Sequence, residues 1–364
     1  MIENIQKVCD AFRIPGTLLS YEEIKRGNIN HTYKVNFHHI NGKPKSYIVQ
    51  KINTEVFHKP IEVMDNIDQV TEYIHATNPG KTVLHFHHTE DRKTYWFEGN
   101  NFWRLFNYIP SRTYDASEDL EIIWNAGYAF GEFQVLLRKF DASHLHETIP
   151  GFHDTIQRYD TLMEHVKQDP CGRVEEVREE LDWLLSVREK ACAITELRRK
   201  GQLPLRVTHN DTKINNVLFE QEGKEAIVVI DLDTVMPGLV GHDFGDAIRF
   251  AANRVAEDSK DYRNAGVNME IFGAFADGFL KQTASALTQK EVDTLALSCF
   301  DMTCELATRF MDDYIMGDKY FKTRWPGHNL DRTRCQVALA QDMERRLEEM
   351  EDVVRDCAAQ YRHS

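Results

Sequence analysis

The N-terminal third of the chain alternates short apolar runs with turn-forming residues, a pattern that is typical of strands. We predict a short helix from residue 1 to about 20, ending near Pro15-Gly16, and a helix over 60–76, where apolar residues recur at helical spacing after Pro60. The predicted strands are 31–37, 46–52, 82–87, 95–98 and 101–109. This region therefore predicts a mixed sheet with one helix.

Beyond residue 117 the apolar spacing becomes that of long helices, which we predict over 117–139, 154–168, 173–200, 268–284, 288–318 and 330–362. One β-rich stretch interrupts them, because 216–219 and 226–232 flank the polar run 220–225, which predicts a hairpin. A chain of 364 residues is long enough for two lobes. We predict an α+β fold with a β-rich N-terminal lobe, residues 1–108, and a larger, mainly helical C-terminal lobe, residues 109–364.

The candidate chemistry concentrates at this hairpin. Residues 209–216 have the form His-x-Asp-x-x-x-x-Asn, which is close to the catalytic loop of kinases. Phosphoryl transfer requires a carboxylate that orients and deprotonates the acceptor, together with oxygen ligands for Mg²⁺. We therefore assign Asp211 as catalytic base and Asn216 as a magnesium ligand, and we predict a protein-kinase-like two-lobe fold that uses ATP and Mg²⁺. The alternative is a polar turn whose side chains bond only the local backbone.

A second magnesium ligand is predicted where the apolar strand 227–230 ends. Asp231 follows this strand directly. Asp233 is two residues further on, on the same side of an extended strand, so it is either another metal ligand or a group that supports the ligands.

A misleading triplet follows downstream. Asp243-Phe244-Gly245 spells the metal-binding motif of protein kinases, but no apolar strand precedes it. We therefore expect Asp243 and Asp246 to brace the catalytic loop through hydrogen bonds to His209 or to the loop backbone.

The nucleotide phosphates are expected at a tight loop between the first two predicted strands. Backbone N–H groups there, around Gly27, Asn28 and Asn30, could cover phosphates. The usual phosphate-binding lysine is not evident, because Gln50 stands where an inward-facing basic residue is expected and Lys51 points to the opposite face.

The run 103–109 is the predicted connection between the lobes. Its backbone, around Phe106 and Tyr108, is where we expect adenine to bind.

Composition narrows the class of partner. The formal net charge of −14 argues against a continuous cationic surface for nucleic acid. The seven cysteines are scattered and form no Cys-x-x-Cys pair, which favours reduced, mostly buried thiols. No secretion signal and no apolar run of membrane-spanning length is evident, so we expect a cytoplasmic protein without a membrane partner.

These motifs resemble the phosphotransferase family of aminoglycoside and choline/ethanolamine kinases, and within it the bacterial N-acetylhexosamine 1-kinases. The similarity covers essentially the full length. It is carried by Arg206–Lys213 with Asn215-Asn216, Ile230–Thr234 with Met236–Gly238, Asp243–Asp246 with Ile248–Phe250, and Phe140–Ser143 with Phe152–Thr155.

The resemblance implies ATP-dependent phosphorylation of the anomeric hydroxyl of N-acetylglucosamine or N-acetylgalactosamine. It implies that Asp211 contacts this hydroxyl and that Arg309 and Tyr320 hold the sugar. Without it, we would interpret Arg309 as a helix salt bridge with Glu305 and Tyr320 as a partly buried aromatic residue. One departure is Asn28, which stands where the family's glycine-rich loop can carry histidine.

Two alternatives stay open at this point. The acceptor could instead be an amino alcohol, an aminoglycoside or another sugar, which would need a carboxylate-rich or aromatic pocket if it is cationic. The chain could also be a nucleotide-binding pseudokinase. The predicted partners are ATP and a small sugar, and the sequence makes no prediction of oligomeric state.

Overall fold

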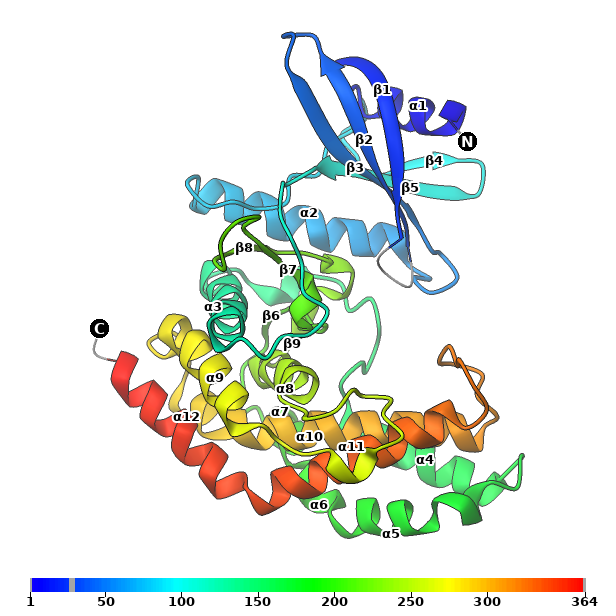
Figure 1. The fold of residues 1–364 in the computed structure, drawn as a ribbon, viewed down its shortest axis with the longest axis vertical. Coiled ribbons are helices and arrows are strands. Elements are labelled where there is room, and N and C mark those ends of the chain that lie inside the picture. The colour runs from blue at the N-terminus through cyan, green and yellow to red at the C-terminus, as the bar shows by residue number, and fades with distance from the viewer. Residues whose placement is uncertain (1, 26–29, 363–364) are drawn as a thin grey trace. The chain divides into compact units, whose positions relative to one another are not determined.

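The computed structural model describes residues 2–25 and 30–362, which form two compact units (Figure 1). Unit 1 contains Met1–Arg112, Ser143–Thr148 and Ile230–Met236, and unit 2 contains Thr113–Ala142, Ile149–Val229 and Pro237–Ser364. The functional lobe boundary at residues 108/109 stays a prediction.

Unit 1 is built on a five-stranded sheet. Its order is β1 (Gly16–Ile24), β2 (His31–His39), β3 (Pro44–Ile52), β5 (Asn101–Asn107) and β4 (Trp96–Glu98). Every neighbouring pair is antiparallel, so the prediction of a mixed sheet was wrong. The links β1–β2, β2–β3 and β4–β5 are too short for the crossover that a parallel pair requires.

The two faces of this sheet differ in character. One face packs its apolar side chains, Val35, Val49 and Leu105 among them, against α1 (Ile2–Ala11). Gln50 and Arg104 are directly opposite each other in register and belong to the other face, because side chains alternate along a strand. The predicted helix over 60–76 is confirmed as α2 (Pro60–Thr77).

Two further predictions in unit 1 were wrong. The predicted helix over residues 1–20 ends at Ala11, and β1 begins at Gly16, where φ is 128° and a Cβ atom would lie 2.3 Å from the backbone oxygen of His38. β1 is largely exposed, so it lacks the apolar alternation that marks a strand. The predicted strand 82–87 is an extended segment with a single bridge between Phe86 and Phe106.

Unit 2 is mainly helical, as predicted. Its long helix α10 (Gln289–Ile315) begins with a capping box formed by Thr288 and Glu291. The hairpin is confirmed, because β7 (Val217–Phe219) pairs antiparallel with β8 (Ala226–Val229). The other helices are α3 (Leu120–Leu136), α4 (Thr155–Gln168), α5 (Arg178–Ser186), α6 (Arg188–Ala191), α7 (Ala193–Arg199), α8 (Val240–Ala251), α9 (Met269–Thr283), α11 (His328–Arg345) and α12 (Leu347–Tyr361).

Two of the predicted helices are broken. The segment predicted as 173–200 contains α5, α6 and α7, and the segment predicted as 330–362 is divided at Arg346 into α11 and α12. Met343 and Met350 are buried on either side of the second break. The apolar period therefore continues across the break, which is why the sequence pattern does not reveal it.

Helices α3 and α9 pack closely, and glycine permits the contact. A Cβ atom on Gly278 of α9 would lie 2.1 Å from the backbone oxygen of Trp124 in α3. By contrast, a Cβ atom on Gly273 of the same helix would meet no atom within 4 Å. The first glycine is therefore required by packing and the second is not.

Candidate functional site

The predicted catalytic loop follows β6 (Arg206–Thr208) in unit 2 and is fixed by the first turn of α8. The carboxylate of Asp243 accepts hydrogen bonds from the backbone N–H groups of His209, at 2.9 Å, and of Asn210, at 2.8 Å. Asn210 adopts φ 64°, in the left-handed region that few non-glycine residues occupy. Burial raises the pKa of Asp243. The prediction that Asp243 braces the loop is confirmed.

Asp246 braces the same loop further along. Its carboxylate accepts a hydrogen bond from the backbone N–H of Thr212 at 3.0 Å and forms an ion pair with Arg249 at 2.7 Å. Burial alone would raise the pKa of Asp246, but the charges of Arg249 and Lys213 outweigh it and lower that pKa to about 2. The carboxylate is therefore held ionised beneath the loop, which confirms the second predicted brace.

Asp211 lies between two donors from its own loop. Asn216 donates from Nδ2 to the Oδ2 atom of Asp211 at 3.1 Å and to its backbone oxygen at 2.8 Å. The Nζ atom of Lys213 lies 2.8 Å from the Oδ1 atom of Asp211. Two predicted site residues, Asp211 and Asn216, are thus in direct contact.

Lys213 was missed by the sequence prediction. Burial by itself would lower the pKa of Lys213, but the charges of Asp211 and Asp246 and the bond to Asp211 raise it. The lysine therefore stays cationic beside the predicted base. Its place between Asp211 and Asn216 in the loop was the available signal, because a cation suits a site where phosphate is transferred.

Asp231 occupies a short segment of unit 1 that follows β8. It has φ 61° and ψ 59°, so it leaves the strand in the left-handed conformation, and it is exposed. A 3-10 turn, Leu232–Thr234, follows. The expectation that Asp231 and Asp233 share one side of an extended strand was therefore wrong. Strained backbone of this kind clusters at functional sites.

Asp233 is buried and held by two partners. It forms an ion pair with Arg104, and both side chains are only 3% exposed. Asn30 donates to its Oδ2 atom at 2.8 Å. The same segment is fixed to α2, since Asn66 donates to the backbone oxygen of Val235 at 2.9 Å. Of the two roles considered for Asp233, these contacts favour support over metal ligation.

The predicted phosphate loop is described only at its end. Gly27 and Asn28 lie outside the described residues. Asn30 lies inside them, and its Oδ1 atom accepts a hydrogen bond from the backbone N–H of Asn53 at 3.0 Å.

The predicted adenine-binding stretch uses part of its backbone within unit 1. The N–H of Asn107 donates to His85, and the N–H of Tyr108 donates to Ser46. The ammonium of Lys34 lies 4.5 Å from the ring centre of Tyr108, and the ring of Phe106 packs against that of Phe86 at a tilt of 44°. Other groups of this stretch must therefore serve any adenine contact.

Arg309 of α10 has the helix neighbour that its spacing predicts. Its Nη1 atom lies 3.4 Å from the Oε1 atom of Glu305, which is also paired with His153 at 3.0 Å. The guanidinium of Arg309 lies over the rings of Phe152 and Phe321. Burial would raise the pKa of Glu305, but His153 and Arg309 lower it to about 2.

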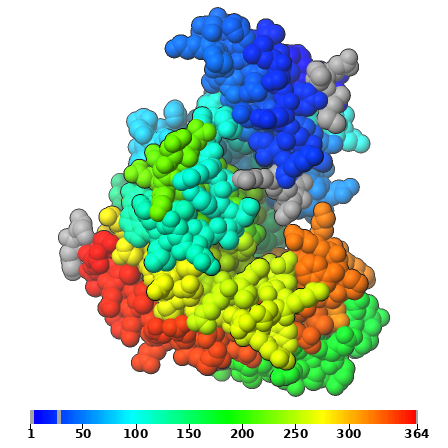
Figure 2. Space-filling model, in the orientation of Figure 1, coloured from blue at the N-terminus to red at the C-terminus, as the bar shows by residue number. Residues whose placement is uncertain are grey.

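Tyr320 belongs to the loop between α10 and α11, the orange segment on the face in Figure 2. Its side chain is 73% exposed, so it is not the partly buried aromatic residue considered above. The loop is organised by Asp313, whose carboxylate accepts the backbone N–H groups of Lys319, Tyr320 and Phe321 at 2.8–2.9 Å. An exposed ring is thus held on a rigid support.

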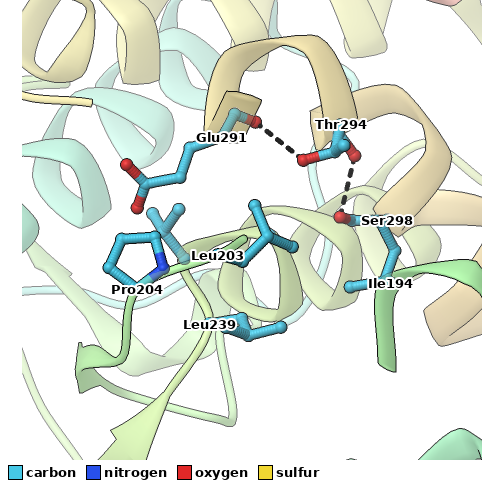
Figure 3. Close-up of a pocket in the computed structure, with 9 residues that line it drawn as sticks. Ile194, Leu203, Pro204, Leu239, Glu291, Thr294 and Ser298 are labelled. Carbon is cyan, nitrogen blue, oxygen red and sulfur yellow. Dashed lines mark hydrogen bonds between the residues drawn. The ribbon is translucent and has the colours of Figure 1, made fainter. Parts of the chain in front are cut away.

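A small pocket elsewhere in unit 2 contains none of these residues (Figure 3). Its lining is mainly apolar, and the hydroxyls of Thr294 and Ser298 are bonded within α10. The carboxylate of Glu291, which also lines the pocket, is paired with Arg206 at 2.6 Å, so these three polar side chains already have partners. None of the helices in the described part of the chain has the length and hydrophobicity of a membrane-spanning segment.

The family is established by direct comparison. The model of the phosphotransferase enzyme family matches residues 20–274, which is more than half of the chain. The protein belongs to this family.

Solved structures of other proteins have a similar fold. The chain is similar to an aminoglycoside phosphotransferase from Alicyclobacillus acidocaldarius, with 13% identity, 96% of each chain covered and a TM-score of 0.62. It is also similar to a microcompartment-associated aminopropanol kinase, with 14% identity, coverage of 96% of this chain and 99% of that one, and a TM-score of 0.57. A choline kinase from Cryptosporidium parvum is similar as well, with 14% identity, coverage of 99% of this chain and 97% of that one, and a TM-score of 0.54. The predicted protein-kinase-like α+β fold is confirmed.

Proposed function

We propose that the protein is an ATP-dependent kinase that phosphorylates the anomeric C1 hydroxyl of N-acetylhexosamines, N-acetylglucosamine or N-acetylgalactosamine, to give the sugar 1-phosphate. The observation that carries the kinase part is the cluster of Asp211, Lys213 and Asn216. It combines a carboxylate, a cation and an amide oxygen in one braced loop.

In this proposal Asp211 accepts a hydrogen bond from the C1 hydroxyl and orients its oxygen in line with the γ-phosphorus of ATP. As the new oxygen–phosphorus bond forms and the bond to the ADP oxygen breaks, the hydroxyl proton passes late to Asp211. Lys213, fixed beside Asp211, stabilises the negative charge of the transferring phosphoryl group in the transition state.

The donor set is compatible with Mg²⁺, which prefers oxygen ligands. Asn216 uses its amide nitrogen for Asp211, which leaves its amide oxygen as the ligand atom, and Asp231 supplies an exposed carboxylate. When bound, magnesium supplies neutralising charge for the β- and γ-phosphates. We propose Asn216 and Asp231 as ligands and Asp233 as their support.

For the rest of the nucleotide, the proposal assigns two stretches. The loop with Gly27, Asn28 and Asn30 covers the phosphates, and the stretch with Phe106 and Tyr108 lies against adenine. We also propose that residues 1–108 form the lobe that covers the nucleotide. Residues 109–364 form the catalytic and sugar-binding lobe.

The acceptor is proposed to be an uncharged sugar held by Arg309 and Tyr320. Arg309 lies close enough to the partly buried Arg158 to lower the pKa of that guanidinium, after the larger effect of burial. Nearby carboxylates are committed to other partners, with Glu305 paired to His153 and Asp313 to backbone N–H groups. Because the neighbouring carboxylates are already paired, the two guanidinium groups would bind hydroxyl and acetamido oxygens better than a positively charged amine.

A different acceptor is the second candidate. The solved structures with similar folds include an aminopropanol kinase, an ethanolamine kinase and a choline kinase, so an amino alcohol is a reasonable competitor. An aminoglycoside or another hexose is a further one. A nucleotide-binding pseudokinase is the least favoured, because the carboxylate and the cation of the loop are both in place.

An acceptor panel tests the proposal. ADP release is measured with N-acetylglucosamine, N-acetylgalactosamine, glucose, choline, ethanolamine and kanamycin, with the D211N variant as control. We expect release with the two N-acetylhexosamines and a decrease of about 10²- to 10⁴-fold in D211N with nearly unchanged ATP affinity. Near-normal turnover by D211N would remove Asp211 as base, and release only with choline or ethanolamine would reassign the acceptor.

A further inference from the structure

In protein kinases, a lysine on the third strand pairs with a glutamate on the helix that packs against the sheet. Among the residues of unit 1 that the structure describes, no lysine of β3 pairs with a glutamate of α2, and Glu62 of α2 pairs with Lys59 instead. The third strand carries the neutral Gln50 on the α2 face, and the α2 side chain that contacts Arg104 is Met64, whose sulfur lies 3.7 Å from Nη1. Within the described part of the chain, the lysine–glutamate pair expected of this fold is therefore missing from β3 and α2.

A different ion pair stands in the same layer. Arg104 is opposite Gln50 in the β3–β5 register and donates from Nε to the Oε1 atom of Gln50 at 2.9 Å. Gln50 in turn donates to Thr32 at 2.9 Å, so three neighbouring strands share one chain of hydrogen bonds. The Nη1 atom of Arg104 pairs with Asp233.

We propose that Arg104 and Asp233 replace the lysine–glutamate pair, and that Arg104 is a positioning residue for Asp231. The inference rests on the proposed role of Asp231 as magnesium ligand. Arg104 fixes Asp233, and this limits the position of Asp231, an exposed residue two positions earlier that turns the chain in a left-handed conformation. In this arrangement the cation belongs to β5 instead of β3, and the carboxylate belongs to the segment Ile230–Met236 instead of α2.

The contacts of Arg104 favour positioning over direct phosphate binding. Its Nε and Nη1 atoms are used by Gln50 and Asp233, and the side chain is only 3% exposed. A buried ion pair is costly to break from one side, since the remaining charge is left without compensation. Loss of Arg104 should therefore release the segment Ile230–Met236 rather than only remove a phosphate contact.

Calorimetry of ATP binding, with magnesium and with chelator, separates these roles. We expect R104M to weaken ATP affinity about tenfold or more in magnesium and by less than about threefold in chelator, and to lower kcat. Hydrogen exchange at 230–236 without nucleotide should become faster. R199M is the matched control, because Arg199 forms a two-pronged ion pair with Asp154 far along the chain and should leave both measurements unchanged.

A second experiment places a cation on β3 instead of β5. In the double variant Q50K/R104M, a lysine at position 50 can occupy the space of the lost guanidinium and reach Asp233. We expect it to recover at least about threefold of the lost magnesium-dependent affinity, and R104K to lose less than R104M.

The outcomes are distinct. The inference is overturned if R104M binds ATP and exchanges at 230–236 like the unmodified protein, or if affinity falls equally with magnesium and with chelator, which indicates direct phosphate contact. If R104M does not fold, the same readouts on R104K and Q50K/R104M decide the question. If the unmodified protein phosphorylates no acceptor, the proposed function fails, while binding and exchange still test the role of Arg104.

Discussion

The ammonium nitrogen of Lys213 lies 2.8 Å from the carboxylate of Asp211, two residues before it in the same loop. The pair places a positive charge beside the group proposed to deprotonate the acceptor. Asp243 and Asp246 accept hydrogen bonds from the backbone N–H groups of Asn210 and Thr212, which hold the loop on either side of Asp211. Preorganised charge of this kind is the main source of rate in phosphoryl transfer.

Replacing this lysine should affect turnover more than binding. We expect K213M to lower kcat by about 10²-fold with less than about fivefold change in the KM for ATP. The reason is that the ammonium of Lys213 acts on the transferring phosphoryl group in the transition state. Steady-state kinetics at saturating acceptor measure the effect. K224M is a suitable control, since Lys224 pairs with Asp119 and Glu121 in an exposed position. An equal loss in both variants would contradict the assigned role.

The acceptor site should respond separately from the nucleotide site. We expect R309M and Y320A to raise the KM for N-acetylglucosamine about tenfold or more while the KM for ATP stays within about twofold. The comparison is F97A, which removes a half-exposed ring from β4 in unit 1. If the KM for ATP rises in parallel with that for the sugar, the two residues do not define the acceptor site.

The brace under the loop predicts a pH dependence. The pKa of Asp246 is lowered from 3.8 to about 2, so its ionised form contributes stability that is complete above pH 3.8 and is lost as the pH falls through about 2. We expect D246N to lower the free energy of unfolding by about 2 kcal/mol at pH 7, and the gap to the unmodified protein to narrow by about 1 kcal/mol between pH 5 and pH 3.

Denaturant unfolding at both pH values measures this gap. D352N is the control, because Asp352 is 57% exposed and pairs with the exposed Arg355. A gap of constant size from pH 5 to pH 3 would show that Asp246 is not held ionised in the folded protein.

Close packing of α3 and α9 predicts opposite effects for two glycines of one helix. We expect G278A to lower the free energy of unfolding by about 1–3 kcal/mol, because its methyl group would overlap the backbone of α3. G273A should leave stability unchanged or raise it by about 0.5–1 kcal/mol, since alanine favours helix and the space is open. Equal values for both variants, by urea denaturation, would contradict the contact.

Much of this architecture follows from local patterns. The helix over 60–76 and the hairpin at 216–232 repeat strong periods and turn residues, so they could be predicted. Exposed β1 could not, because an edge strand with little burial carries no apolar alternation. The break at Arg346 was also hidden, because buried residues continue in phase across it.

The site divides in the same way. Asp211 and Asn216 are adjacent in one motif, and the structure brings them into contact. The partnership of Arg104 with Asp233 depends on residues 129 positions apart, and no local pattern encodes a contact at that separation. Asp233 was therefore placed on an extended strand, although the left-handed Asp231 turns the chain before it.

Phosphorus NMR of the product formed from N-acetylglucosamine, ATP and magnesium tests the central claim most directly. We predict one new phosphomonoester whose phosphorus couples to the anomeric proton, and no such signal with D211N. A phosphate on any other hydroxyl, or ATP that binds and is never transferred to the sugar, would contradict the account.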